Sequence, residues 1–128
     1  TNIRVRGYEL DSYGHVNNAV YLQYLEQGRW EFMKDQGLLE QINLDELLLV
    51  IIETNIKYIR EARLFDDLFV ETGCDLHPPF LIFHQRIVHE KSGLPVSRAK
   101  IKALFLDKAR NPLDIPAFVT AKLKKENG

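Results

Sequence analysis

The sequence is poor in cysteine, in long hydrophobic runs and in net charge. Its single cysteine, Cys74, cannot form an internal disulfide, so we expect a reducing compartment and a cytoplasmic protein. No apolar run reaches the roughly 20 residues that span a bilayer, and the first residues lack a signal-peptide pattern. The formal net charge of −1 gives no overall attraction to nucleic acid or to an anionic membrane, so we expect neither as a partner.

Patterns that bind metals or phosphates are also missing. His77, His84 and His89 are not spaced with carboxylates or with Cys74 as metal ligands are, and no glycine-rich phosphate loop is present. We therefore expect no metal and no cofactor. A composition of 45% hydrophobic and 27% charged residues is ordinary for a globular protein, so residues 1–128 are expected to form one domain without a metal or disulfide to stabilise it.

Hydrophobic periodicity predicts the order of the elements. Ile3 and Val5 alternate with arginines, which indicates a short first strand. Residues 18–36 follow a helical period, with Asn17 as the cap and Gly37 as the stop signal. A shorter helix or turn is expected within residues 38–47. Four β-rich segments follow, at about residues 48–59, 68–76, 80–90 and 96–107.

This order predicts an α+β fold in which one long helix packs across an antiparallel sheet. Ala99 and Ala103, which are small and share one strand face, are expected to let the helix approach closely. The helix has more apolar surface than one sheet can cover, which indicates a second subunit. The basic residues 121–128 are expected to fray. One face of the first long strand is predicted to carry Val50, Ile52, Thr54, Ile56 and Tyr58.

A mainly polar segment, residues 10–17, directly precedes the long helix. Gly14 permits a tight turn with a positive φ, and Asn17 can cap the helix. The backbone N–H groups of the first helical residues, Asn18, Ala19 and Val20, then lack intrahelical partners, and they lie at the positive end of the helix dipole. Such amides suit an anion or a carbonyl oxygen that becomes negative during acyl transfer.

Asp11 lies in the same turn, where its carboxylate can serve as a general base or as a nucleophile. The same residues are also typical of an ordinary turn and helix cap, and His15 can simply donate a hydrogen bond to a nearby carbonyl. Spacing alone favours capping over catalysis.

The motif D-x-x-G-H-V-N-N-x-x-Y, from Asp11 to Tyr21, closely resembles a signature of the hotdog-fold thioesterases of the 4-hydroxybenzoyl-CoA thioesterase-like group. The segment IKYIREARLFDDLFVET, residues 56–72, is similar to the strand, turn and strand of that family. The resemblance implies a hotdog fold, a five-stranded antiparallel sheet wrapped around one long central helix. It also implies dimers or homotetramers, and hydrolysis of an acyl-CoA or acyl carrier protein thioester.

The resemblance assigns roles to individual positions. Asp11 matches the catalytic aspartate, and the backbone N–H of Asn18 matches the group that polarises the thioester carbonyl. His15 matches the motif either as an orienting hydrogen-bond donor or as part of the local structure. Plant acyl carrier protein thioesterases have an asparagine where this chain has Tyr13, so their proposed histidine-centred mechanism is not carried over. The substrate is expected to contact Gly14, Asn17, Tyr21, Arg60 and Arg63.

Two sets of cations can hold the phosphates of coenzyme A. One set is Lys57, Arg60 and Arg63, and the other is Arg98, Lys100 and Lys102. Two other functions remain open. One is a hotdog dehydratase or hydratase that acts on the same thioesters, and the other is a non-catalytic acyl-CoA-binding module.

Overall fold

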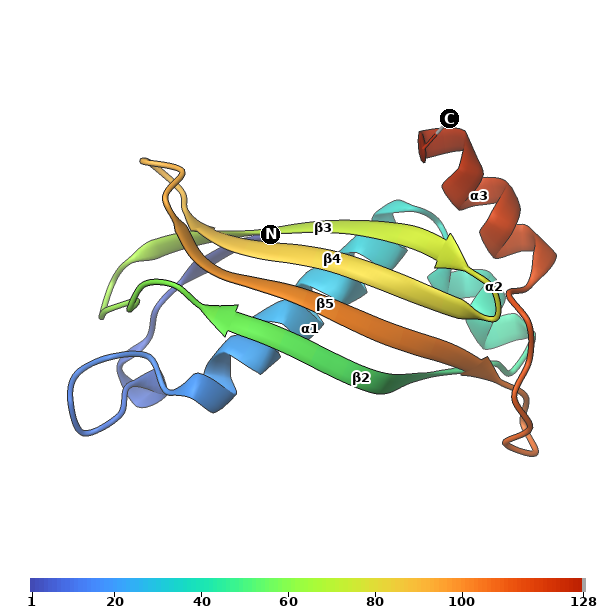
Figure 1. Cartoon of the computed structure of the whole chain (residues 1–128), viewed down its shortest axis with the longest axis horizontal. Coiled ribbons are helices and arrows are strands. Elements are labelled where there is room, and N and C mark those ends of the chain that lie inside the picture. Colours follow the sequence, from blue (N-terminus) through green and yellow to red (C-terminus); the bar gives the residue numbers. More distant parts are fainter. Residues whose placement is uncertain (128) are drawn as a thin grey trace.

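The computed structural model describes residues 1–127 of the chain, with side chains up to residue 123. Five antiparallel strands form one sheet in the order β1-β3-β4-β5-β2. The strands are β1 (Asn2–Arg4), β2 (Leu48–Tyr58), β3 (Asp67–His77), β4 (Phe80–His89) and β5 (Pro95–Leu106). The helices are η1 (Gly7–Glu9), α1 (Asn18–Asp35), α2 (Leu39–Leu44) and α3 (Ala117–Asn127). The curved sheet lies across α1, which confirms the predicted α+β hotdog fold (Figure 1).

The long helix α1 begins and ends as predicted. The side chain of Asn17 accepts a hydrogen bond from the backbone N–H of Ala19, and Gly37 follows the helix with a φ of +71°. The closest approach to the sheet is at Gly28, where an added Cβ would lie 2.6 Å from Cγ1 of Val70. Only glycine lets α1 lie this close to β3, so Gly28 has the role that we had assigned to Ala99 and Ala103.

The prediction for β2 is wrong in the first half of the strand. Ile51 pairs with Ala103, whereas Glu53 pairs with Lys102, so Ile52 is an extra residue that forms a β-bulge. The bulge reverses the alternation of side chains on its N-terminal side. The inner face of β2, which faces α1, therefore consists of Leu49, Ile51, Thr54, Ile56 and Tyr58.

The C-terminal segment also differs from the prediction. We expected residues 121–128 to fray, but α3 continues to Asn127, and Gly128 lies outside the described residues. Val119 and Leu123 lie one helical turn apart and are buried, and α3 packs next to β3. Lys122 donates a hydrogen bond to the carbonyl oxygen of Gly37, which links α3 to the end of α1. Two apolar positions among several lysines gave too weak a helical period to predict this.

Candidate active site

The polar segment before α1 folds into a tight turn around Gly14, whose φ is +79° as predicted. One carboxylate oxygen of Asp11, Oδ1, accepts hydrogen bonds from the backbone N–H groups of Tyr13 (2.8 Å) and His15 (3.2 Å). The turn interpretation of Asp11 is therefore correct for this oxygen. Its second oxygen, Oδ2, has no hydrogen-bond partner within the residues whose side chains the structure describes.

Three backbone N–H groups at the start of α1 were expected to lack intrahelical partners, and one of them has no acceptor at all among the described residues. The predicted cap, Asn17, accepts from another. The N–H of Ala19 donates to Oδ1 of Asn17 (3.0 Å), and the N–H of Val20 donates to the backbone carbonyl of Asn17 (2.9 Å). Within residues 1–127, the N–H of Asn18 has no acceptor. It lies at the positive end of the helix dipole, where a polarised carbonyl oxygen is favoured.

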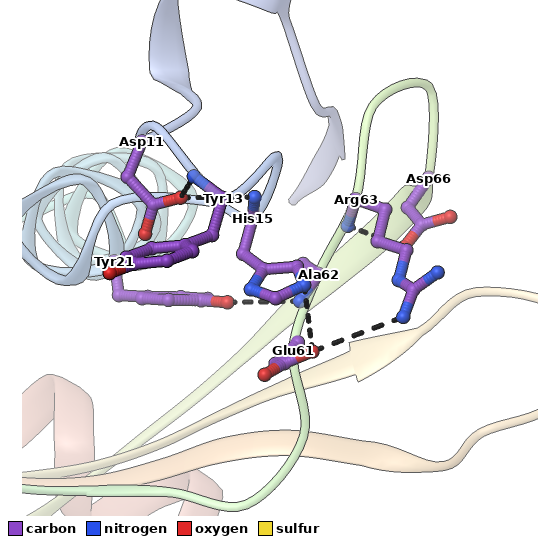
Figure 2. A network of polar contacts seen from close by, with 8 residues as sticks. All are labelled: Asp11, Tyr13, His15, Tyr21, Glu61, Ala62, Arg63 and Asp66. Atoms are coloured by element: carbon purple, nitrogen blue, oxygen red, sulfur yellow. Dashed lines mark hydrogen bonds and ion pairs between the residues drawn. The ribbon is translucent and has the colours of Figure 1, made fainter.

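Asp11 and Asn18 line the same cleft, which has a volume of about 730 Å³. The cleft lies between the start of α1 and residues 58–63, the end of β2 and the segment that follows it. Figure 2 shows Asp11 on the side of α1 and Glu61 with Arg63 on the opposite side. Its lining residues are Asp11, His15, Val16, Asn18, Tyr21, Tyr58, Ile59, Arg60, Glu61 and Arg63.

The structure thus brings together six of the eight residues expected at the site, namely Asp11, His15, Asn18, Tyr21, Arg60 and Arg63. Gly14 and Asn17 do not line the cleft. Gly14 forms the turn and Asn17 caps the helix, so both help to position the residues that line the cleft. A direct contact of Gly14 or Asn17 with substrate stays a prediction.

Two tyrosines hold the walls of the cleft together. The hydroxyl of Tyr21 accepts a hydrogen bond from the backbone N–H of Ala62 (3.1 Å), and the hydroxyl of Tyr58 donates to the carbonyl oxygen of Asn18 (3.2 Å). The two rings contact each other edge to face, with centroids 5.4 Å apart. Burial raises the pKa of Tyr21, so its hydroxyl stays protonated. The unpaired N–H of Asn18 is therefore held at a fixed position relative to the opposite wall.

His15 contacts a carboxylate that the sequence analysis did not single out. Its Nε2 lies 3.0 Å from Oε2 of Glu61, and Nη2 of Arg63 lies 4.0 Å from the same oxygen. The backbones of His15 and Arg63 form an isolated β-bridge, which places both side chains at the cleft. His15 thus contacts Glu61, and its role in catalysis stays a prediction.

Glu61 and Tyr58 were both missed. Tyr58 was assigned only to a strand face, and Glu61 lies in the polar turn REAR, where a glutamate carries no functional signal. Their contacts join segments about 40 residues apart in the chain, such as Tyr58 with Asn18. No local spacing in the sequence predicts such a contact.

The two sets of cations lie at different places. Arg60 and Arg63 line the cleft, and Nη1 of Arg60 also donates to the carbonyl oxygen of Pro95 (3.0 Å). Lys57 pairs with Arg98 across the outer face of the sheet, and it does not line the cleft. Lys100 and Lys102 lie on the same outer face as Arg98, because the alternating residues of β5, such as Ala99, are buried on the inner face.

Other reactive groups do not compete with Asp11 in the described part of the chain. Cys74 is buried on the inner face of β3, as expected, and burial raises the pKa of its thiol to about 12. No group of three histidine, cysteine or acidic side chains among residues 1–123 is placed to hold a metal ion. No helix that the structure describes has the length and apolarity needed to cross a membrane.

The buried carboxylate of Glu9 stabilises the segment that leads into α1 beside the cleft. Glu9 is 3% exposed and accepts hydrogen bonds from the backbone N–H of Arg6, the guanidinium of Arg6 and the hydroxyl of Tyr24, each at 2.8 Å. Its backbone carbonyl accepts from the N–H of Asn17 (2.9 Å), the residue that caps α1. Burial alone would raise the pKa of Glu9, but the bonds from Arg6 and Tyr24 outweigh burial and lower it. Glu9 is therefore ionised, and its hydrogen bonds hold the start of α1 in place.

We expect Glu9→Gln to lower the free energy of unfolding by about 2 kcal/mol at pH 7, because charge-assisted hydrogen bonds are lost. A depressed pKa makes this stabilisation fully present above the pKa of an unfolded glutamate, about 4.3, and it is lost as the pH falls through the folded pKa. The difference between wild type and variant should therefore shrink below about pH 4. Urea unfolding at pH 7 and at acidic pH measures it, and an equal difference at both would contradict the assigned role.

A curved antiparallel sheet around one long helix, with a cleft at the start of that helix, defines a hotdog-fold protein. The sequence profile of the thioesterase-like superfamily matches residues 5–123. The long-chain acyl-CoA thioesterase FadM of Escherichia coli is 34% identical over 127 residues, which are 98% of this chain and 96% of that protein.

The acyl-acyl carrier protein thioesterase ATL3 of Arabidopsis thaliana is 32% identical over 126 residues, 94% of this chain and 64% of that protein. Among solved structures, the probable thioesterase YbaW of Escherichia coli superposes with a TM-score of 0.89 at 34% identity, covering 98% of this chain and 96% of that one. The chain therefore belongs to the thioesterase-like superfamily, and it is a thioesterase.

Proposed function

We propose that the protein hydrolyses an acyl-CoA thioester to a free acid and a thiol, with Asp11 and the backbone N–H of Asn18 as the catalytic groups. One observation carries this proposal. A carboxylate oxygen and a helix-start N–H, both without partners among the described residues, line one cleft. Oδ1 of Asp11 forms the turn, which leaves Oδ2 available to a water molecule or to a carbonyl carbon.

The chemistry requires a base or nucleophile and a donor for the developing oxyanion. In one route, Oδ2 of Asp11 accepts a proton from water as the water oxygen bonds to the carbonyl carbon. The N–H of Asn18 stabilises the negative carbonyl oxygen, the C–S bond then breaks, and the thiolate takes up the proton. In the other route, Oδ2 bonds to the carbonyl carbon, the C–S bond breaks and the thiolate leaves. Water then hydrolyses the resulting mixed anhydride to the free acid and the Asp11 carboxylate, and the thiolate takes up the proton that is released. In both routes His15 and Glu61, which contact each other in the lining of the cleft, supply hydrogen bonds to the bound substrate.

Coenzyme A is the proposed carrier because the cleft has its own cations. Arg60 and Arg63 lie at the wall opposite Asp11, and guanidinium groups suit phosphate oxygens. Of the two sets of cations considered from the sequence, only Arg60 and Arg63 of the first set line the cleft, which supports their role in binding phosphate. An acyl carrier protein also presents its acyl group through a phosphate-bearing arm, so it is the alternative carrier.

The assembly that we propose is a dimer, or a homotetramer made of two dimers. β2 is an edge strand of the sheet and exposes Ile52, which is 51% accessible, while α1 exposes Leu22, which is 42% accessible. A long apolar edge strand is rarely left uncovered, so two copies that pair along β2 would satisfy it. Sedimentation equilibrium gives the mass. We also propose that the protein works in the cytoplasm, since its one cysteine is buried and needs no oxidising compartment.

Release of free thiol from a panel of acyl-CoAs and acyl carrier protein thioesters tests the function. We expect a thiol and a free acid in equal amounts from at least one acyl-CoA. Mass spectrometry of the products separates the alternatives, because a dehydratase or hydratase changes the acyl group by one water and leaves the thioester intact. Tight binding of acyl-CoA without any product would identify a binding module and would overturn the proposal.

A further inference from the structure

The turn between β2 and β3 contains a conformational outlier, Phe65, whose φ is +64°. The backbone N–H of Asp66 donates to the carbonyl oxygen of Arg63 (3.0 Å), so residues 63–66 form a β-turn in which Phe65 is the third residue. A third turn residue with a positive φ is normally glycine or asparagine, because the Cβ of a larger residue crowds the backbone. A phenylalanine at this position is therefore strained.

Packing inside the chain does not explain why this turn carries an aromatic residue. The side chain of Phe65 is 70% exposed, so it gains little of the stabilisation that burial gives a phenyl ring. Glycine would form the same turn without strain and without an apolar group in water. Strained residues of this kind cluster at sites that bind a ligand, which makes the exposed ring a candidate for such a contact.

The backbone of the turn is held firmly in place. Besides the bond that closes the turn, the N–H of Arg63 donates to Oδ2 of Asp66 (2.8 Å). The N–H of Phe65 donates to the carbonyl oxygen of Val5 (3.1 Å), and the N–H of Val5 donates to the carbonyl oxygen of Asp66 (3.0 Å). Val5 is fully buried and anchors the turn to the core. The ring of Phe65 is thus carried by a preorganised support, which reduces the entropy that is lost when a ligand binds.

The turn also borders the candidate active site. Arg63 lines the cleft, and its backbone is bridged to that of His15. Phe65 follows Arg63 by two residues, so their Cα atoms are at most about 7 Å apart. Figure 2 shows the side chain of Arg63 extending from this turn toward Glu61. One short turn therefore carries a guanidinium that suits phosphate and an aromatic face that suits a planar base.

We propose that Phe65 stacks on the adenine base of coenzyme A while Arg63 binds a phosphate of the same nucleotide, so that Phe65 selects coenzyme A as the carrier. The inference rests on the proposed function, which places the thioester in the cleft. The arm of an acyl carrier protein has a phosphate but no purine base, so only coenzyme A can use the ring. Stacking of a base on an aromatic side chain strengthens binding about 5- to 100-fold.

Two thioesters with the same acyl group and different carriers test the inference. One is the acyl-CoA, and the other is the acyl-pantetheine 4′-phosphate, which keeps the arm and one phosphate but lacks the adenosine. The quantity measured is the ratio of their kcat/KM values, in which effects on folding, assembly or the catalytic groups cancel. Phe65→Gly should lower this ratio about 5- to 100-fold, mainly by raising KM for the acyl-CoA. Phe65→Trp should retain the ratio, because an indole ring also stacks on a base.

Leu64→Ala is the matched control. Leu64 is the preceding residue of the same turn, and it is also apolar and exposed, but its φ is not positive. The ratio should stay unchanged in this variant. A fall equal to that of Phe65→Gly would show that the preference depends on the turn and not on the aromatic ring, and it would overturn the inference.

The two proposals fail in different ways. An unchanged ratio in Phe65→Gly, with normal thiol release, overturns the inference and leaves the proposed function standing. Absence of thiol release from every acyl-CoA overturns the proposed function. Calorimetric titration with free coenzyme A needs no turnover, so it tests the stacking contact in either case. Weaker binding in Phe65→Gly but not in Leu64→Ala supports the contact, and equal binding in both variants and the wild type overturns it.

Discussion

Replacing Asp11 by asparagine is expected to lower kcat for acyl-CoA hydrolysis by about 10²- to 10⁴-fold, the usual contribution of a general base. The substitution keeps an oxygen at the Oδ1 position, so the hydrogen bonds from the N–H groups of Tyr13 and His15 remain possible. Only the second oxygen changes, from a proton acceptor to an amide NH₂. Thermal unfolding should therefore stay close to wild type while thiol release collapses.

Asp66→Asn is the matched control. Asp66 also supports a turn, since its Oδ2 accepts a hydrogen bond from the backbone N–H of Arg63 (2.8 Å), but it does not line the cleft. The control removes one negative charge close to the same wall (Figure 2). Equal activity of Asp11→Asn and Asp66→Asn, with both proteins folded, would show that Asp11 forms only the turn.

A single turnover in ¹⁸O-labelled water can detect the covalent route for Asp11. A nucleophilic carboxylate becomes part of an anhydride. When water attacks the acyl carbon, the label enters the free acid and Asp11 keeps both of its own oxygens. Attack at the aspartyl carbon instead places label in Asp11, which mass spectrometry of the peptide detects. A general base never acquires label. Label in Asp11 thus proves the covalent route, while unlabelled Asp11 with labelled acid fits both the base and attack at the acyl carbon.

The parts of the site that the sequence predicted are those built from neighbouring residues. Gly14 needs a positive φ, Asn17 caps the helix and Asp11 accepts bonds from the turn that it begins, and all of these contacts lie within a few residues. The same local patterns also placed α1 and its stop at Gly37. Short-range hydrogen bonds and hydrophobic periodicity favour particular residue types at particular positions, so both can be predicted from the sequence.

The parts that could not be predicted depend on contacts between distant segments. Glu61 contacts His15 only because residues 15–16 are joined to residues 62–63 in the folded chain. A glutamate in a loop gives no indication of such a contact in the sequence. The bulge at Ile52 moves the residues that precede it to the opposite face of β2. An alternating pattern of β-branched residues does not show where such a shift occurs. Without the bulge, Ile51 would lie on the outer face of the sheet.

The oxyanion role of Asn18 can be tested by deleting its backbone N–H, which only proline does. Asn18 is the first residue of α1, a position where proline is favoured because its N–H makes no helical bond. Asn17 has φ −60° and ψ 138°, extended values that a residue before proline readily adopts. The carbonyl of Asn18 keeps its bond from Tyr58. Asn18→Pro should therefore fold normally.

We expect Asn18→Pro to lower kcat about 10²- to 10³-fold with little change in KM, because the lost hydrogen bond strengthens only as negative charge develops on the carbonyl oxygen. Asn18→Ala removes the same side chain but retains the N–H, so it should keep nearly all of the wild-type kcat. Comparing kcat and KM of the two variants measures the effect of the Asn18 backbone N–H alone. If both variants fold and lose activity equally, the side chain of Asn18 is what matters, and the helix start does not hold the oxyanion.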